Sequence, residues 1–283
     1  MKRLFKAFLF KLTRDLTFRI TLIIGAGMAL LMTGIYLVID LTAATEGVLG
    51  DTKFLTGQTM LIASMSPAQN YGLAIPINVV SFICLEFTQG TIRNKIIAGN
   101  SKFNIYVSLF LSGLVFCFAL LGVYVLLCFG IGCIFGGFDP NGYYILGGYL
   151  SPEFIIKMVV VCLLAYLSII SFTVFISTTL RTIGPCIPIV IVVIVMLTLF
   201  GSFFSSFANL GLFENDDTLI WVNRIVNPLY AINAGEYTQV DEYAPPIMTI
   251  TNETFIPAIC SNVFYTSVFF GFGALEFSKR DVK

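Results

Sequence analysis

Charge is scarce in this chain, and histidine is absent. Only 11% of its 283 residues are charged, whereas soluble domains carry about 25%. Hydrophobic residues make up 57% of the chain, and the mean hydropathy is +0.92. Without histidine, the chain cannot form a Ser-His triad, a histidine proton relay or a histidine metal site. The composition indicates a membrane protein and excludes an ordinary soluble enzyme.

Other signatures of catalysis and ligation are missing as well. The sequence contains no phosphate-binding GxxxxGK[ST] loop, no HExxH and no nucleophile elbow. Its seven cysteines are an odd number without a CxxC pair, which predicts small buried hydrophobic residues. No basic domain is present, so nucleic acid is not an expected partner. We therefore expect no catalytic residues, no cofactor and no metal on this chain.

Long apolar runs dominate what is present. A membrane span needs roughly 20 apolar residues to cross about 30 Å of hydrocarbon. Six stretches meet this length: residues 20–39, 61–85, 105–135, 154–180, 183–207 and 257–275. The third is longer than one crossing needs and rich in glycine, so we expect it to tilt or to break at its outer end. The whole chain, residues 1–283, is predicted to be one all-α membrane domain.

Residues 151–153 show where the fourth helix should begin. Ser151 is suited to an N-cap, Pro152 to the first helical position, and Glu153 to the first turn.

Lysine and arginine set the predicted orientation. With the N-terminus inside, only three of the 16 basic residues lie outside, namely Lys53, Lys157 and Arg224, and the other 13 lie inside. By the positive-inside rule, both termini are expected in the cytoplasm.

The segments outside the spans have their own patterns. In residues 1–19, a face of Leu and Phe side chains predicts an amphipathic helix at the membrane interface. Charged residues interrupt this segment, so we do not expect a signal peptide. Residues 208–256 form an extracellular loop too long for a simple turn, which predicts short helices within it.

The predicted spans carry no charged residue at their centres. Ion-coupled carriers usually place an ionisable group there, so uphill transport by this protein needs another source of energy. Pro76 is expected to kink the second span. Two residues on, Asn78 either bonds a neighbouring helix or lies, with Pro76, on a substrate path, and the sequence leaves both alternatives open.

Residues 86–102 form the most informative segment, the cytoplasmic loop between the second and third spans. Glu86 and Arg93 are seven residues apart, hence on one face if the segment is helical. The isoleucines of this segment form a short apolar stripe. Gly99, which follows them, is a plausible helix stop. A short amphipathic helix is predicted here. Such a helix can transmit a push from a soluble partner into the spans, although a generic amphipathic loop has the same pattern.

The loop also carries a motif that consists of Glu86, Gly90, Thr91, Arg93, Asn94, Lys95, Gly99 and Lys102. This motif resembles the first cytoplasmic loop of type-2 ABC transporter permeases, the membrane subunits of bacitracin-, lantibiotic- and sodium-efflux type systems. Six spans, a basic interfacial helix and a long outer loop before the sixth span, which contains Asn227-Pro228, extend the resemblance over nearly the full length.

The resemblance implies a partner and a mechanism. Two copies of a separate ABC ATPase subunit, which carry ATP and Mg²⁺, would dock on this loop. A second permease chain, the same or homologous, would complete the pathway in the lipid bilayer of a bacterial cell. Glu86 and Arg93 would pair, Gly90 would allow close approach, and Lys95 would meet acidic residues of the ATPase. The implied cargo is a peptide antibiotic or another amphipathic or lipid-like molecule.

Two other functions fit parts of the sequence. A stand-alone channel or passive carrier would need no ATPase. A membrane enzyme working at the outer surface would use acidic residues of the last loop, for which the candidates are Asp216, Asp217, Glu236, Asp241 and Glu242.

Overall fold

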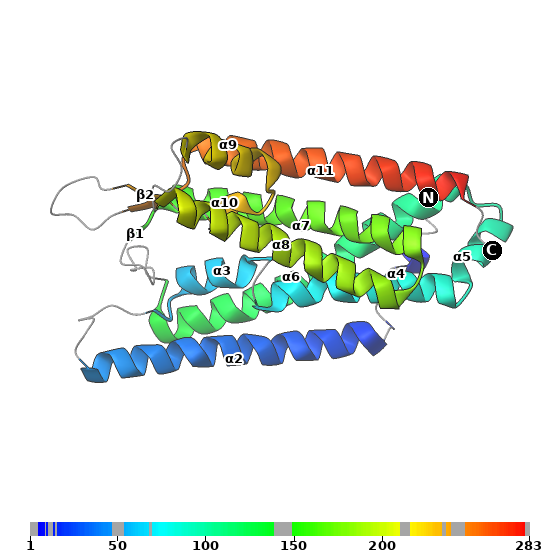
Figure 1. Ribbon diagram of the computed structural model, residues 1–283. Coiled ribbons are helices and arrows are strands. Elements are labelled where there is room, and N and C mark those ends of the chain that lie inside the picture. Colours follow the sequence, from blue (N-terminus) through cyan, green and yellow to red (C-terminus); the bar gives the residue numbers. More distant parts are fainter. Residues whose placement is uncertain are drawn as a thin grey trace.

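The computed structural model describes residues 5–8, 10, 14, 16–46, 54–67, 70–138, 149–209, 216–233, 236–238 and 247–280. Within these ranges the chain is a bundle of long helices that lie roughly side by side (Figure 1). The helices are α2 (Leu16–Glu46), α3 (Gly57–Met65), η1 (Asn70–Leu73), α4 (Ala74–Thr88), α5 (Thr91–Ile97), α6 (Lys102–Gly136), α7 (Pro152–Leu180), α8 (Ile183–Asn209), α9 (Asp216–Val226), α10 (Tyr230–Asn233) and α11 (Asn252–Lys279).

Within the described ranges, five helices are long and apolar enough to cross a membrane: α2, α6, α7, α8 and α11. A sixth crossing results if α4 and α5, which meet at an angle of 57°, are taken as one bent span. The predicted helical membrane architecture is confirmed at this level, with five to six candidate spans.

The second predicted span, residues 61–85, is wrong as a single helix. Helix α3 ends at Met65, and α4 begins only at Ala74, after the short 3-10 helix η1. At Gly72 a side chain has no room, because the Ser66 carbonyl and the Tyr166 hydroxyl lie against its Cα. Pro76 falls in the first turn of α4, where its missing N–H costs nothing, so it does not kink the helix.

Of the two expectations for the third span, the break at its outer end is not seen. Helix α6 runs continuously from Lys102 to Gly136. Its 35 residues measure about 52 Å at 1.5 Å per residue, so it extends past a hydrocarbon core of about 30 Å or lies tilted in it. Two of its glycines serve packing. A Cβ on Gly132 would collide with Met60 of α3, and a Cβ on Gly136 would collide with Leu55, just before α3.

Helix α7 is the most buried of the candidate spans and packs along α11, α4 and α8. It begins as predicted, because Ser151 accepts a hydrogen bond of 3.0 Å from the backbone N–H of Phe154. Its serine and threonine hydroxyls donate to carbonyls one turn earlier, as Thr173 does to Ile169 at 2.7 Å. Bonded in this way, small hydroxyl side chains can be buried between helices.

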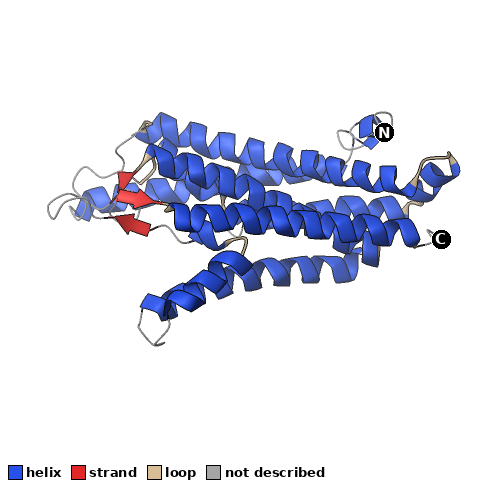
Figure 2. Ribbon diagram, turned by 90° about the horizontal axis from the view of Figure 1, so that it is seen from above, coloured by secondary structure: helices blue, strands red, loops and turns tan. Residues whose placement is uncertain are grey.

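The two ends of the bundle differ. One end, here called the sheet end, holds three short strands: β1 (Tyr149–Leu150), β2 (Glu236–Thr238) and β3 (Ile247–Thr249). Strand β3 is central, parallel to β1 and antiparallel to β2. Helix α5 and the last turn of α11 lie at the opposite end, here called the α5 end (Figures 1 and 2).

The predicted loop 208–256 contains α9 and α10, as expected, and two strands that were not foreseen.

Candidate functional site

The sequence motif folds around a buried carboxylate at the α5 end. The Glu86 side chain, on the last turns of α4, is only 1% exposed. Its Oε2 atom lies 2.8 Å from the ammonium nitrogen of Lys95 on α5. The hydroxyl of Thr91, at the start of α5, also donates a hydrogen bond to Oε2. Glu86 therefore ties the end of α4 to both ends of the next helix.

This arrangement depends on Gly90. The residue separates α4 from α5 with a φ of 67°, in the left-handed region that glycine adopts without a Cβ penalty. A Cβ at this position would meet nothing within 4 Å. Gly90 is thus needed for the backbone turn, and its expected role in the close approach of a partner stays a prediction.

The turn also changes the partner of Glu86. A continuous helix across residues 86–93, as predicted, would place Glu86 and Arg93 on one face. Because the chain turns at Gly90, the ion pair that the structure shows runs to Lys95, and Arg93 is exposed. Lys95, expected to meet the ATPase, instead faces inward with a side chain 19% exposed.

The inner face of α5 packs on the N-terminal segment. Residues 5–8 are helical, and Phe8 is buried. The Lys95 ammonium stands 3.2 Å from the centre of the Phe8 ring, at cation–π distance. Ile92 is fully buried beside this contact, whereas Ile97 is 73% exposed. Only part of the predicted isoleucine stripe is therefore packed.

The chain segment that follows α5 is held by hydrogen bonds, as is the turn that precedes it. Gly99 adopts a φ of 83° just after the helix, as its predicted role of helix stop requires. The Asn100 side chain donates to the Lys95 carbonyl at 2.9 Å, and Ser101 caps α6. Lys102 then donates to the carbonyl of Arg280, beyond the end of α11, at 2.8 Å. Helix α5 is thus held by α4 and α6, and the start of α6 is bonded to the end of α11.

The outer side of the same turn borders a hollow of about 260 Å³. Its lining residues come from the α4–α5 turn and the α7–α8 turn: Phe87, Thr88, Gly90, Ile92, Arg93, Arg181 and Thr182. Arg181 has a φ of 60°, rare for a residue with a side chain. Two arginines and two threonines make this hollow suited to an anionic group. Asn94, beside Arg93, is exposed.

The structure supports one of the two alternatives for Asn78. Its Oδ1 atom accepts a hydrogen bond of 2.9 Å from Thr21 on α2, and its amide donates to Ala74 at 2.7 Å. The residue therefore bonds helix α2 to helix α4. A place for Pro76 and Asn78 on a substrate path stays a prediction.

Sequence reasoning missed a second polar centre, near the sheet end. The Asn262 amide on α11 donates to the carbonyl of Pro228 at 3.0 Å, and its Oδ1 accepts from Ser168 on α7 at 2.8 Å. Asn227 donates to the Leu197 carbonyl on α8 at 2.8 Å. The short link between α9 and α10 is thus fastened directly to α8 and α11, and through Asn262 to α7. A lone asparagine inside an apolar run was the available signal.

The acidic candidates of the enzyme alternative fall only in part within the described residues. Glu236 lies in β2, and Asp216 and Asp217 begin α9. Asp241 and Glu242 lie outside the described residues. Among the residues that the structure describes, no three His, Cys, Asp or Glu side chains are grouped so that they could hold a metal ion.

Comparison with known proteins adds no relative. No family model matches the chain, and neither curated proteins nor solved structures include a similar one.

Proposed function

We propose that this chain is the membrane-spanning permease subunit of an ATP-driven ABC exporter. A separate ATPase, in two copies, supplies the energy, and a second permease chain completes the pathway. The cargo class is amphipathic, either a peptide antibiotic or a lipid-like molecule. In this proposal the α5 end faces the cytoplasm of a bacterial cell, and the amphipathic N-terminal helix lies at the membrane surface.

The position and contacts of helix α5 are the main support for this proposal. This helix is seven residues long and lies at one end of the bundle, with the motif of the permease loop along it. The Glu86–Lys95 pair fixes its angle to α4, and the Lys102–Arg280 bond fixes its exit to α11. A short helix held from both sides moves with the spans to which it is joined. Force applied to α5 by a partner is thus passed to α4 and α6.

The hollow beside α5 supplies a docking surface for that partner. Arg93 and Arg181 border it, and Arg93 is exposed. A carboxylate on the ATPase can form a bidentate hydrogen bond with a guanidinium group, which favours a fixed geometry. In this proposal Arg93 replaces Lys95 as the residue that meets the ATPase.

Co-purification tests the docking surface. The chain is expressed with the ATPase encoded nearby, and capture of the ATPase is measured for Arg93→Glu. The charge reversal should weaken capture by at least about tenfold, because like charges then face each other. Lys279→Glu is the matched control, since Lys279 is exposed at the same end but outside the hollow. Equal capture by both variants contradicts the assigned surface.

Cysteine labelling tests the orientation independently. A membrane-impermeant maleimide is applied to intact cells that express single-cysteine variants in a cysteine-free background. Asn94→Cys, at the α5 end, should be labelled only after lysis, whereas Asn252→Cys, at the start of α11, should be labelled on intact cells. The reverse pattern places α5 outside and removes the proposed function. Ion conductance of the purified chain in liposomes without any ATPase would favour a channel instead.

A further inference from the structure

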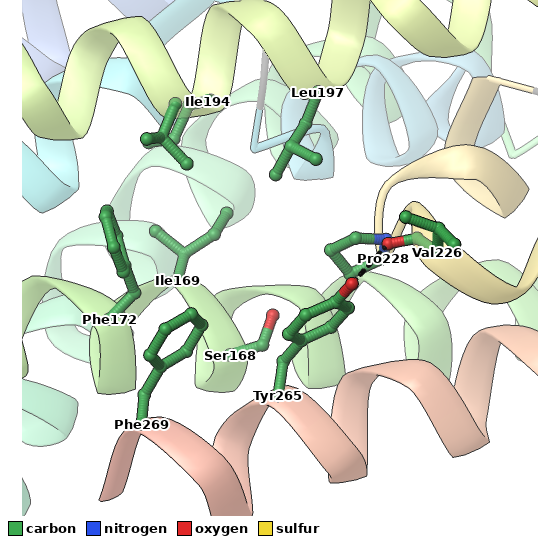
Figure 3. Close-up of a pocket in the computed structure, with 10 residues that line it drawn as sticks. Ser168, Ile169, Phe172, Ile194, Leu197, Val226, Pro228, Tyr265 and Phe269 are labelled. Carbon is green, nitrogen blue, oxygen red and sulfur yellow. Dashed lines mark hydrogen bonds between the residues drawn. The ribbon is translucent and has the colours of Figure 1, made fainter. Parts of the chain in front are cut away.

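An apolar cavity of about 170 Å³ lies among α7, α8, α11 and the link from α9 to α10 (Figure 3). One wall is aromatic, formed by Phe172, Tyr265 and Phe269. Ile194 and Leu197 of α8 face this wall, and Ile169 lies beside Phe172 on α7. Phe172 and Phe269 pack edge to face, with ring centres 5.0 Å apart, so the aromatic wall is firm.

Two hydroxyl groups line the cavity, and each already donates its proton to a hydrogen bond within the protein. The Tyr265 hydroxyl donates to the Val226 carbonyl at 2.8 Å (Figure 3). The Ser168 hydroxyl donates to Oδ1 of Asn262 at 2.8 Å. No charged side chain is among the residues that line the cavity. A charged group would therefore lose its hydration here without gaining a partner, whereas hydrocarbon would not.

The cavity reaches an apolar part of the surface. Val226 lines it and is 52% exposed. Met196 of α8 and Phe264 of α11, each next in sequence to a lining residue, are also exposed. In a bilayer these exposed side chains meet lipid chains, since both helices are long and apolar enough to span it. Hydrocarbon is thus the material available at the mouth.

We propose that this cavity binds one acyl chain of a bilayer phospholipid, with the head group outside. The size fits a chain segment, since an apolar cavity of about 150 Å³ holds the six carbons of benzene. The remaining methylenes leave past Val226 into the surrounding lipid. This inference rests on the cavity alone and does not depend on the proposed ATPase partner.

Photolabelling of the purified chain, without any ATPase, tests the proposal. The probe is a phosphatidylcholine that carries a diazirine in the middle of one palmitoyl chain. After illumination, mass spectrometry should find the label on cavity segments of α7 and α11. Leu197→Trp fills the cavity and should lower this label by about tenfold, which corresponds to about 1.4 kcal/mol of binding. Met196→Trp changes the residue just before Leu197 on α8, whose side chain is exposed, and should leave the label unchanged.

Three results would overturn the proposal. The first is label spread evenly over outward faces such as that of Phe264, and the second is equal label in both tryptophan variants. The third is cross-linking of two chains through Val226→Cys in a Cys260→Ser background without any lipid label, which would assign the mouth to an interface between copies. If Leu197→Trp elutes as an aggregate in gel filtration, the smaller change Ile194→Phe replaces it, with the same expected loss of label.

Discussion

The ammonium of Lys95 lies 2.8 Å from Oε2 of Glu86 across the turn that separates α5 from α4. Glu86 is 1% exposed and Lys95 is 19% exposed, so the pair lies at the inner edge of the bundle. The chain bends by 57° between the two helices. Straightening this bend would separate the charges. The pair thus holds α5 at a fixed angle.

The first prediction concerns this pair. Lys95→Met removes this cation from the buried Glu86 carboxylate, which should lower the free energy of unfolding by about 3 kcal/mol. Adding Glu86→Gln removes the buried negative charge as well, so the double variant should recover part of the loss. Thermal unfolding of the purified chain in detergent measures both changes.

Arg280→Met is the control for that experiment. It breaks an ion pair with Glu276 whose side chains are 50% and 31% exposed. Such a pair contributes about 0–1 kcal/mol, so stability should change little. A loss as large as that of Lys95→Met would mean that the buried position of Glu86 is not what matters.

The second prediction concerns the turn. Gly90→Ala should destabilise the α5 end by about 1 kcal/mol, because alanine resists the left-handed conformation at φ 67°. Gly122→Ala is the matched control, because neither position has a neighbour within 4 Å of an added Cβ and only Gly90 has a positive φ. Hydrogen exchange of the α5 amides should rise in the first variant only.

Sequence patterns predicted the long helices well and the turns between them poorly. Hydropathy located α2, α6, α7, α8 and α11, because each is a continuous apolar run. It joined α3 to α4, although residues 66–73 between them read Ser-Pro-Ala-Gln-Asn-Tyr-Gly-Leu and contain the proline, asparagine and glycine that typically mark a turn. The break thus had a local signal that the hydropathy of the whole run outweighed, whereas the close approach of Gly72 to Tyr166 could be seen only in the fold.

The motif residues show the same limit. Spacing placed Glu86, Lys95 and Arg93 in one segment, but pairing Glu86 with Arg93 required a straight helix. The left-handed turn at Gly90 rotates α5 and brings Lys95 inward instead. Arg181 was not singled out, because only the fold brings the α7–α8 turn to this segment.

The third prediction concerns the contact of α3 with α6. Gly136→Val should displace α3, because even a Cβ at this position overlaps the Leu55 carbonyl. Gly130→Val is the control on the same helix, where an added Cβ meets nothing within 4 Å. The yield of monodisperse protein and its unfolding temperature should fall for Gly136→Val alone. Equal behaviour would show that α3 does not pack closely on α6.

The fourth prediction concerns the link between α9 and α10, which is held from two sides. Asn262→Leu removes the donor to the Pro228 carbonyl, and Asn227→Ala removes the donor to Leu197 on α8. Each leaves a buried carbonyl without that donor, which should cost about 1–3 kcal/mol. Because both side chains hold the same short segment, their effects should not add, with a coupling of about 0.5–3 kcal/mol.

A double-mutant cycle in thermal unfolding measures that coupling. Ser267→Ala is the reference on α11, because its exposed hydroxyl bonds only its own helix, at the Val263 carbonyl. Additive losses from Asn227→Ala and Asn262→Leu would mean that the two sides of the link act separately. A coupled loss would mean that the link, α8 and α11 unfold together. In that case the wall that Pro228 and Tyr265 give to the apolar cavity is as stable as the bundle itself.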